Sequence, residues 1–250
     1  MNTSEAVLIV IPARYASSRF PGKPLADIAG RPMIAHVIDR CRASCSGEAR
    51  VLVATDSTEI ADAARACGAE ARMTPPELPS GTERVAYAAR GEAEGIIVNV
   101  QGDEPLLDPR GIDTVVGMLR SDPSFDIATL ASPISAEEAA DPNIVKAVVA
   151  LDGHALYFSR ARIPHARDEA APAVYLGHIG LYGFRRDALL RFASLPPSAL
   201  EDTEKLEQLR ALDHGMRIGV GRAARRSPAV DVPSDIARVL EALHADASQA

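Results

Sequence analysis

The chain has 250 residues, of which 47% are hydrophobic, and this is enough for one large α/β domain or two small ones. Its net charge of −7 argues against a nucleic-acid-binding protein, which would need a broad basic face. No apolar stretch reaches the roughly 20 residues of a membrane span, and the polar start at residues 1–5 lacks the regions of a signal peptide. Three cysteines without a C-x-x-C pair fit a reducing compartment. We therefore expect a cytoplasmic protein with no nucleic-acid or membrane partner.

The first half of the chain alternates short apolar runs with helical patterns. Strands are predicted over residues 7–11, 51–55 and 96–100, and helices from Arg31, from about Ser57 and from Ser80. Asp56 is expected to cap the second helix, with Glu59 reaching back as a capping box. Because the strands are apolar throughout and helices connect them, they predict a mostly parallel central sheet with helices on both faces.

In the second half, two strand patterns flank Asp152-Gly153 and predict a hairpin. The other predicted strands cover residues 126–131, 177–184 and 218–221, and the predicted helices cover 109–120, 186–193, 199–214 and a segment from about Ser234. No linker splits the chain. We therefore predict one α/β domain over residues 1–250, with residues 145–190 as a smaller, β-rich, antiparallel part.

A cationic loop follows the first strand. Residues 12–24 carry Arg14, Arg19 and Lys23 between three prolines, each of which removes a backbone donor and restrains the chain. The loop matches neither the G-x-G-x-x-G nor the Walker pattern, and its charges suit a triphosphate. The alternative is a solvated basic loop.

A second polar cluster stands at the end of the strand over residues 96–100. Ligands bind at the carboxyl ends of strands in open α/β sheets, so Gln101 is placed to hydrogen-bond a ligand and Asp103 to coordinate Mg²⁺. The alternative for this cluster is a capped turn. Far downstream, Asp231 is a second metal carboxylate if the fold brings it near Asp103, and otherwise a loop residue.

Several motifs together resemble one family, the 3-deoxy-manno-octulosonate (Kdo) cytidylyltransferases, also called CMP-Kdo synthetases. They cover nearly the whole chain, at residues 12–24, 54–56, 80–84, 98–105, 157–160 and 206–210. The resemblance implies a nucleotide-diphospho-sugar transferase-like α/β fold with a smaller dimerisation part, and a homodimer. It also implies CTP and Kdo as substrates, Mg²⁺ as cofactor, and transfer of CMP to the anomeric hydroxyl of Kdo for lipopolysaccharide biosynthesis.

The resemblance also implies roles for individual residues. The catalytic residues would be Lys23, Arg19, Asp103 and Asp231, of which Asp103 and Asp231 would hold the metal. The nucleotide would contact Ala13, Arg14, Arg19, Lys23, Ser80, Gly81 and Gln101. The sugar acid would contact Gln101, Arg167, His178, Tyr182, Glu207 and Gln208.

The residues themselves leave alternatives open. A guanidinium suits the sugar carboxylate, and Arg160, Arg162 and Arg167 are all candidates, of which the resemblance favours Arg167. His178 and Tyr182 are four apart on a predicted strand, where they project to one face, either toward a ligand or as a cross-strand packing pair. The alternative functions are a cytidylyltransferase for another ulosonic acid, such as 8-amino-Kdo or sialic acid, and a CTP-binding regulator without turnover.

Overall fold

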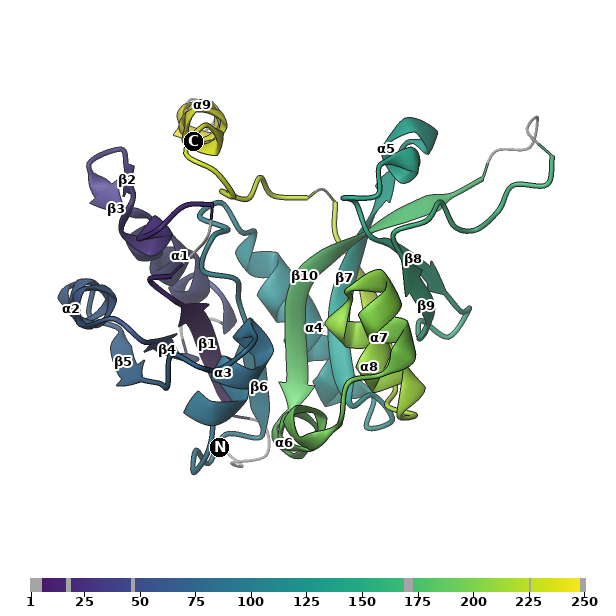
Figure 1. The fold of residues 1–250 in the computed structure, drawn as a ribbon, viewed down its shortest axis with the longest axis horizontal. Helices are drawn as coiled ribbons and strands as arrows, with labels where there is room; N and C mark the ends of the chain where they lie inside the picture. The colour runs from purple at the N-terminus through teal and green to yellow at the C-terminus, as the bar shows by residue number, and fades with distance from the viewer. Residues whose placement is uncertain (1–5, 17–18, 46–47, 169–172, 225, 248–250) are drawn as a thin grey trace. The chain divides into compact units, whose positions relative to one another are not determined.

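A computed structural model describes residues 6–16, 19–45, 48–168, 173–224 and 226–247 (Figure 1). The polar start at residues 1–5, on which the expectation of no signal peptide rests, lies outside this part of the chain. The contacts divide the protein into two compact units, which are unit 1, Met1–Asp113 with Ser227–Ala250, and unit 2, Thr114–Arg226. The single domain with a β-rich part at residues 145–190 stays a prediction, and that stretch falls inside unit 2. Across the described residues, no helix is both long and apolar enough to cross a membrane.

Unit 1 is built on a parallel sheet. Its strands are β1 (Val7–Ala13), β4 (Arg50–Thr55), β5 (Glu70–Met73) and β6 (Ile96–Asn99), in the order β6-β1-β4-β5. The three predicted apolar strands are confirmed. The sequence did not predict β5, because none of its four residues is buried and they form no apolar run.

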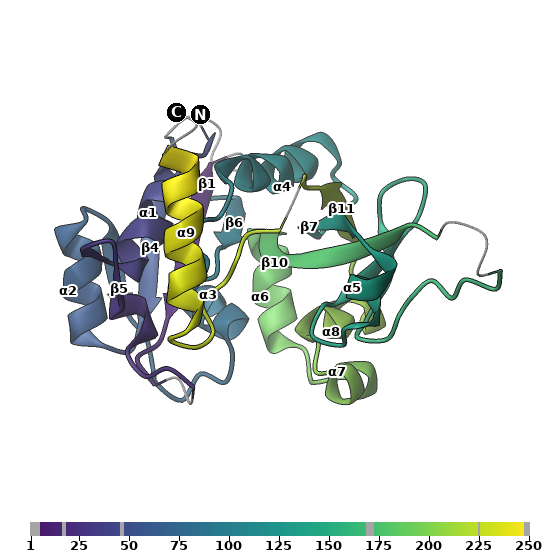
Figure 2. The ribbon, with the colours of Figure 1, turned by 90° about the horizontal axis from the view of Figure 1, so that it is seen from above.

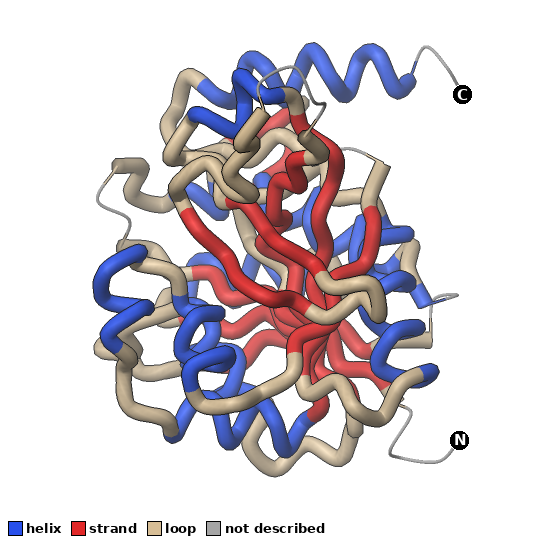
Figure 3. Tube along the Cα trace, turned by 90° about the vertical axis from the view of Figure 1, so that its right-hand side faces the viewer, coloured by secondary structure: helices blue, strands red, loops and turns tan. Residues whose placement is uncertain are grey.

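Three helices flank this sheet, namely α1 (Met33–Arg42), α2 (Thr58–Ala66) and α3 (Gly81–Ala88). α1 packs beside α2, whereas α3 packs on β1 and β4. The right-handed rule for crossover connections places α3 on the face opposite α1 and α2. The mostly parallel α/β class with helices on both faces is thus confirmed, and Figure 3 shows strands with helices beside them.

The starts of two helices differ from the prediction. α1 begins after Pro32, because Arg31–Pro32 forms the short strand β3, which pairs with β2 (Asp27–Ile28). Ser57 caps α2, with its Oγ accepting the N–H of Ile60, so the prediction of Asp56 as the cap was wrong. Ser80 caps α3 as predicted.

The end of the chain returns to unit 1. The last helix, α9 (Asp235–Ala247), follows the segment that carries Asp231 (Figure 2). Its residue Val239 joins Ile28, Met33 and Val230 in a fully buried apolar cluster. The N–H of Val230 donates to the carbonyl of Asp103 at 2.9 Å, and this places the segment at residues 227–234 against the loop that follows β6.

Unit 2 contains a largely antiparallel sheet. β7 (Ile127–Ile134) pairs antiparallel with β10 (Tyr175–Arg185) and parallel with β11 (Ile218–Arg222). The predicted hairpin is confirmed as β8 (Lys146–Val149) and β9 (Ala155–Ser159), and β8 also pairs with β10. α4 (Pro109–Ser121) spans the boundary between the units.

Four further helices belong to unit 2. They are α5 (Ala136–Ala140), α6 (Arg186–Ser194), α7 (Ala199–Glu204) and α8 (Glu207–Asp213). The prediction of a single helix over residues 199–214 was wrong. Lys205 has a φ of 53°, which is left-handed backbone that ends α7 and starts a new helix axis at Glu207.

Candidate functional site

One cavity of unit 1 gathers all nine residues that the sequence predicted for the nucleotide and the metal. It is lined by Pro12, Ala13, Arg14, Arg19, Lys23, Pro24, Leu78, Ser80, Gly81, Arg84, Gln101, Gly102, Asp103 and Asp231. These residues come from four separate stretches of the chain. The structure therefore brings together what the sequence spreads over more than 200 positions.

Parallel strands explain why these stretches meet. β1 and β6 pair directly, so the loops after their carboxyl ends lie at the same edge of the sheet. Gly102 permits the closest approach of these two loops, because a Cβ at this position would lie 2.9 Å from the carbonyl oxygen of Pro12. A larger residue would push the loop of Asp103 away from β1.

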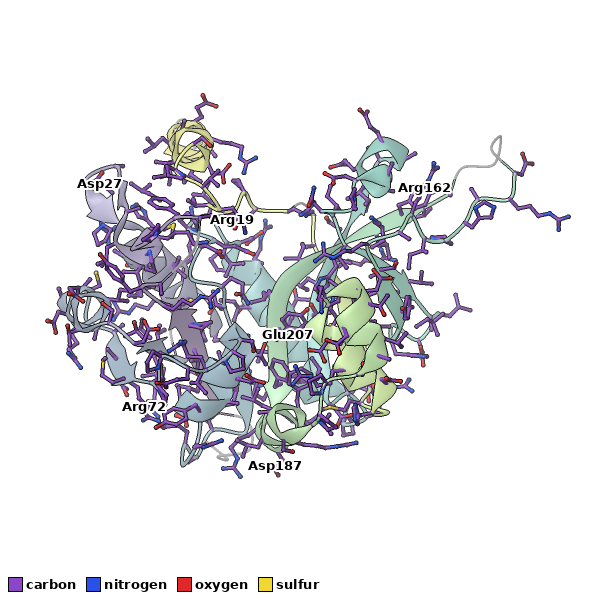
Figure 4. The ribbon with its side chains drawn as sticks, in the orientation of Figure 1. Arg19, Asp27, Arg72, Arg162, Asp187 and Glu207 are labelled. Carbon is purple, nitrogen blue, oxygen red and sulfur yellow. The ribbon has the colours of Figure 1, made fainter. Side chains whose placement is uncertain are left out.

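Two of the cations and both carboxylates that line the cavity form one cluster. Nζ of Lys23 lies 2.6 Å from Oδ2 of Asp103, 2.9 Å from the carbonyl of Val230 and 3.8 Å from Oδ1 of Asp231. Arg19 donates to Asp231 at 3.2 Å, and its side chain is well exposed (Figure 4). Asp103 and Asp231 thus converge on a single ammonium group, as the sequence prediction of a two-carboxylate site required.

The loop that carries Arg19 is closed at its base. The N–H of Gly22 donates to the carbonyl of Tyr15 at 3.0 Å, and the φ of Gly22 is 69°. A β-carbon at Gly22 would contact the ring of Tyr15 and would be strained at this φ, so glycine suits this position. Lys23 follows directly and begins a short 3₁₀ turn, Lys23–Leu25.

The opposite end of the cavity is formed by the start of α3. Ser80 and Gly81 stand where the first backbone N–H groups of the helix face outward. Arg84, one turn further, also lines the cavity although its side chain is only 2% exposed. Burial lowers the pKa of Arg84, with a smaller effect from the charge of Arg14. Arg84 belongs to the sequence motif at residues 80–84, but no sequence pattern indicated a role for it.

The predicted sugar-side residues other than Gln101 lie in unit 2. His178 and Tyr182 share one face of β10, with ring centroids 5.4 Å apart. The prediction that both rings lie on one face is confirmed, but the strand between them contains a β-bulge. His178 pairs with Ala131 and Tyr182 with Thr129, so four residues of β10 span only two of β7, and the rings come closer than on a regular strand.

Thr129 contacts the backbone of this bulge, and no sequence pattern indicated this role. Its hydroxyl lies 2.8 Å from the carbonyl of Leu181, 3.1 Å from that of Ile179 and 3.0 Å from Nε2 of His178. Thr129 is fully buried. Its one proton can be donated to one of these two carbonyls at a time, and its oxygen can accept from the imidazole of His178.

Burial keeps both rings neutral. It lowers the pKa of His178 to about 3, with a smaller contribution from the charge of Arg226. Burial also raises the pKa of Tyr182, and the nearby carboxylate of Glu207 adds to this effect. Glu207 begins α8 (Figure 4), and the neighbouring Gln208 is buried.

The three candidate arginines have different environments. The guanidinium of Arg160 donates to the carbonyls of Glu204, Pro142 and Lys205, and its backbone N–H donates to the Glu204 carboxylate. Arg162 donates to the hydroxyl of Tyr175 and stacks over its ring (Figure 4). Arg167 is exposed and lies between β9 and β10 in the chain. Of the three, Arg160 uses its guanidinium to bind backbone carbonyls of the protein.

A strand-end cavity in a mostly parallel α/β unit, lined by four cationic side chains and two converging carboxylates, is typical of an enzyme that binds a nucleoside polyphosphate. Comparison with known proteins agrees. The pattern of the cytidylyltransferase family matches residues 8–218. The chain therefore belongs to the cytidylyltransferase family and is a nucleotidyltransferase.

Individual relatives of the chain carry a more specific name than the family. The 3-deoxy-manno-octulosonate cytidylyltransferase of Myxococcus xanthus is 52% identical over 92% of this chain and 93% of its own length. The enzyme of the same name from Nitratidesulfovibrio vulgaris is 54% identical over 94% of both chains. A solved CMP:2-keto-3-deoxy-manno-octonic acid synthetase in complex with CTP has a TM-score of 0.93 and 44% identity, covering 96% of this chain and 99% of that one.

Proposed function

We propose that this chain transfers CMP from CTP to the anomeric hydroxyl of Kdo and releases pyrophosphate, which activates Kdo for lipopolysaccharide biosynthesis. The convergence of Lys23, Asp103 and Asp231 in a cavity that also contains Arg14 and Arg19 carries the proposal. The names of the similar enzymes support the choice of both substrates. They also favour Kdo over the other ulosonic acids and turnover over simple CTP binding.

The reaction brings two anions together, and the cavity offsets their charge. The sugar hydroxyl attacks the α-phosphorus of CTP, a new O–P bond forms, the bond to the β-phosphate oxygen breaks, and the hydroxyl proton leaves to solvent. Arg14, Arg19 and Lys23 stabilise the charge that develops on the departing pyrophosphate. Holding both substrates in reacting geometry can lower the barrier by about 7–11 kcal/mol.

The cytosine end of the nucleotide lies against Ala13, Ser80 and Gly81 in this proposal. The first N–H groups of α3 are hydrogen-bond donors without helical partners, and they suit the acceptor atoms of a base or of a ribose. Gln101 follows β6 at the same edge and contacts both substrates.

Mg²⁺ is the cofactor in this proposal, and the donors fit it. Within the described ranges, no three His, Cys, Asp or Glu side chains are grouped as a complete metal site. Mg²⁺ commonly uses only one or two protein carboxylates and completes its shell with phosphate oxygens and water. Asp103 and Asp231 already share one cation, the ammonium of Lys23. When bound to them, the ion would polarise phosphate oxygen as a Lewis acid.

The sugar acid contacts Gln101, Arg167, His178, Tyr182, Glu207 and Gln208 in this proposal. Neutral imidazole and phenol groups suit sugar hydroxyls, because each can donate or accept without a change of charge. Arg167 can bind both oxygens of the sugar carboxylate in one plane. The backbone contacts of Arg160 support Arg167 over Arg160 for this role.

A cytoplasmic homodimer completes the proposal. Within the described residues, β9 pairs with β8, one bridge joins the neighbouring His154 to Gly219 of β11, and Leu151 and Leu156 of the same hairpin are exposed. Exposed apolar side chains on a hairpin suit contact with a second copy of the chain. The three cysteines are free thiols, which agrees with a reducing compartment.

Pyrophosphate release tests the function directly. The purified chain is incubated with CTP, Mg²⁺ and one of Kdo, 8-amino-Kdo or N-acetylneuraminic acid. We expect rapid release with Kdo and the slowest release with N-acetylneuraminic acid. No release with Kdo, or faster release with another acid, would overturn the proposed substrate, and calorimetric CTP binding without any release would indicate a regulator.

A further inference from the structure

The position of Asp56 in the sequence suggests a helix cap, but its contacts in the structure indicate another role. It follows β4 directly and precedes α2, where a helix cap would stand, but Ser57 takes that role. The carboxylate of Asp56 is only 8% exposed and turns toward two other parts of unit 1. A buried carboxylate without a capping function calls for a different explanation.

One oxygen of Asp56 anchors the cationic loop over residues 12–24, which we call the triphosphate loop. Its Oδ1 accepts the backbone N–H of Tyr15 at 3.0 Å, a contact between residues 41 positions apart. The carbonyl of the same residue, Tyr15, accepts the N–H of Gly22, which closes the loop that carries Arg19. Asp56 therefore fixes the base of this loop from outside it, one peptide unit from the closure.

The other oxygen anchors the opposite wall of the cavity. Oδ2 of Asp56 accepts from Nη2 of Arg84 at 3.3 Å. Nη1 of Arg84 donates to the hydroxyl of Thr74 and, at 3.3 Å, to the carbonyl of Pro75. Arg84 thus joins α3 to the loop that leads from β5 to α3.

We propose that Asp56 is a positioning residue for CTP, and that its two oxygens set the triphosphate loop and the start of α3 at the spacing that the nucleotide requires. This inference rests on the proposed function, because it assigns the cavity to CTP. Asp56 also places a negative charge between the buried guanidinium of Arg84 and the cationic loop, where the charges of Arg14 and Arg84 repel each other.

Two substitutions separate the two contacts. In Asp56→Asn, the amide oxygen can still accept the N–H of Tyr15, but the NH₂ group cannot accept from Arg84. In Asp56→Ala, both contacts are lost. Asp62→Asn, on the exposed face of α2, is the matched control, since its carboxylate is 75% exposed.

The first measurement is hydrogen exchange of the ligand-free protein. We expect the Tyr15 and Gly22 amides to exchange at least tenfold faster in Asp56→Ala than in the wild type, and Asp62→Asn to leave them unchanged. Unchanged protection of both amides in Asp56→Ala would overturn the proposal. This experiment needs no substrate, so it remains decisive even if the chain transfers nothing to Kdo.

The second measurement separates positioning from general stability. We expect both Asp56 variants to raise the KM for CTP, and its Kd in calorimetry, at least tenfold, with the KM for Kdo changed less than twofold. Asp56→Glu, which restores the charge, should recover part of the affinity. Faster exchange with an unchanged Kd for CTP would contradict the proposal, as would an equal rise of both KM values.

Discussion

The two units hold their polar groups in opposite ways. In unit 1, the cavity presents charged side chains on loops, and Arg19 and Asp231 are more than half exposed. In unit 2, His178 and Tyr182 lie on a strand, and burial shifts the pKa of each ring in the direction that favours its neutral form. Exposed charges can meet a polyanion without a large desolvation cost, whereas buried neutral groups discriminate by hydrogen-bond geometry.

Arg210 should give the largest effect on stability. It donates two hydrogen bonds to Glu201, at 2.8 and 2.6 Å, and both side chains are nearly buried. Arg210→Ala leaves the carboxylate buried and unpaired, and we expect it to lower the free energy of unfolding by about 3–5 kcal/mol.

The matched control is Arg65→Ala in unit 1, which removes an exposed pair with Asp62 and should cost less than about 0.5 kcal/mol. Urea denaturation measures both. Equal effects of the two substitutions would erase the contrast between buried and exposed ion pairs.

Asp103 should give the largest effect on activity. Asp103→Asn removes one of the two carboxylates that converge on Lys23, and we expect turnover to fall at least about a hundredfold, equivalent to about 3 kcal/mol. The affinity for CTP should change little, because the cations that hold the triphosphate remain. Initial rates and calorimetry test this. Undiminished turnover would remove Asp103 from the metal site.

His178 makes the stability of the protein depend on pH. Its pKa is about 3 in the folded protein, below its ordinary value of 6.5, so the unfolded chain binds more protons between these limits. The contribution to stability is complete above pH 6.5 and is lost as the pH falls. Between pH 7.5 and pH 5 we expect a loss of about 2 kcal/mol from this residue.

Denaturation of the wild type and of His178→Asn at both pH values gives the change in the free energy of unfolding with pH for each protein. The difference between these two changes measures the loss. His165→Asn, at an exposed position, is the control. Parallel pH dependence of the wild type and His178→Asn would mean that the imidazole is not held neutral by the fold.

Arg19 should show a small change in stability. Its pair with Asp231 is exposed, and we expect Arg19→Ala to alter the free energy of unfolding by less than about 1 kcal/mol. The KM for CTP should nevertheless rise severalfold, and the rise should shrink in high salt because screening weakens the contribution of Arg19 in the wild type. A large loss of stability with an unchanged KM would assign Arg19 to the fold instead.

The sequence predicted well which loops of unit 1 meet in the cavity, because the signals for these loops are local. Apolar strand runs followed by polar loops place Arg14, Gln101 and Asp103 at one edge of a parallel sheet without any knowledge of distant contacts. Local signals do not predict the position of Asp231, because it depends on the packing of α9 and on the hydrogen bond between Val230 and Asp103. The family resemblance supplied that link.

Long-range contacts explain what the sequence missed. Asp56 and Ser57 are equally good caps by type, and only the distant partners Tyr15 and Arg84 decide between them. The bulge in β10 depends on Thr129, a residue on another strand. The break at Lys205 carries no glycine or proline, so a continuous helix was the natural expectation.

A crystal structure of the chain with Mg²⁺ and a non-hydrolysable CTP analogue tests the central claim most directly. We predict the triphosphate against Arg14, Arg19 and Lys23, the base at the start of α3, and metal density on Asp103 and Asp231. A nucleotide bound elsewhere, or a triphosphate without contact to Lys23 and Asp103, would contradict the account.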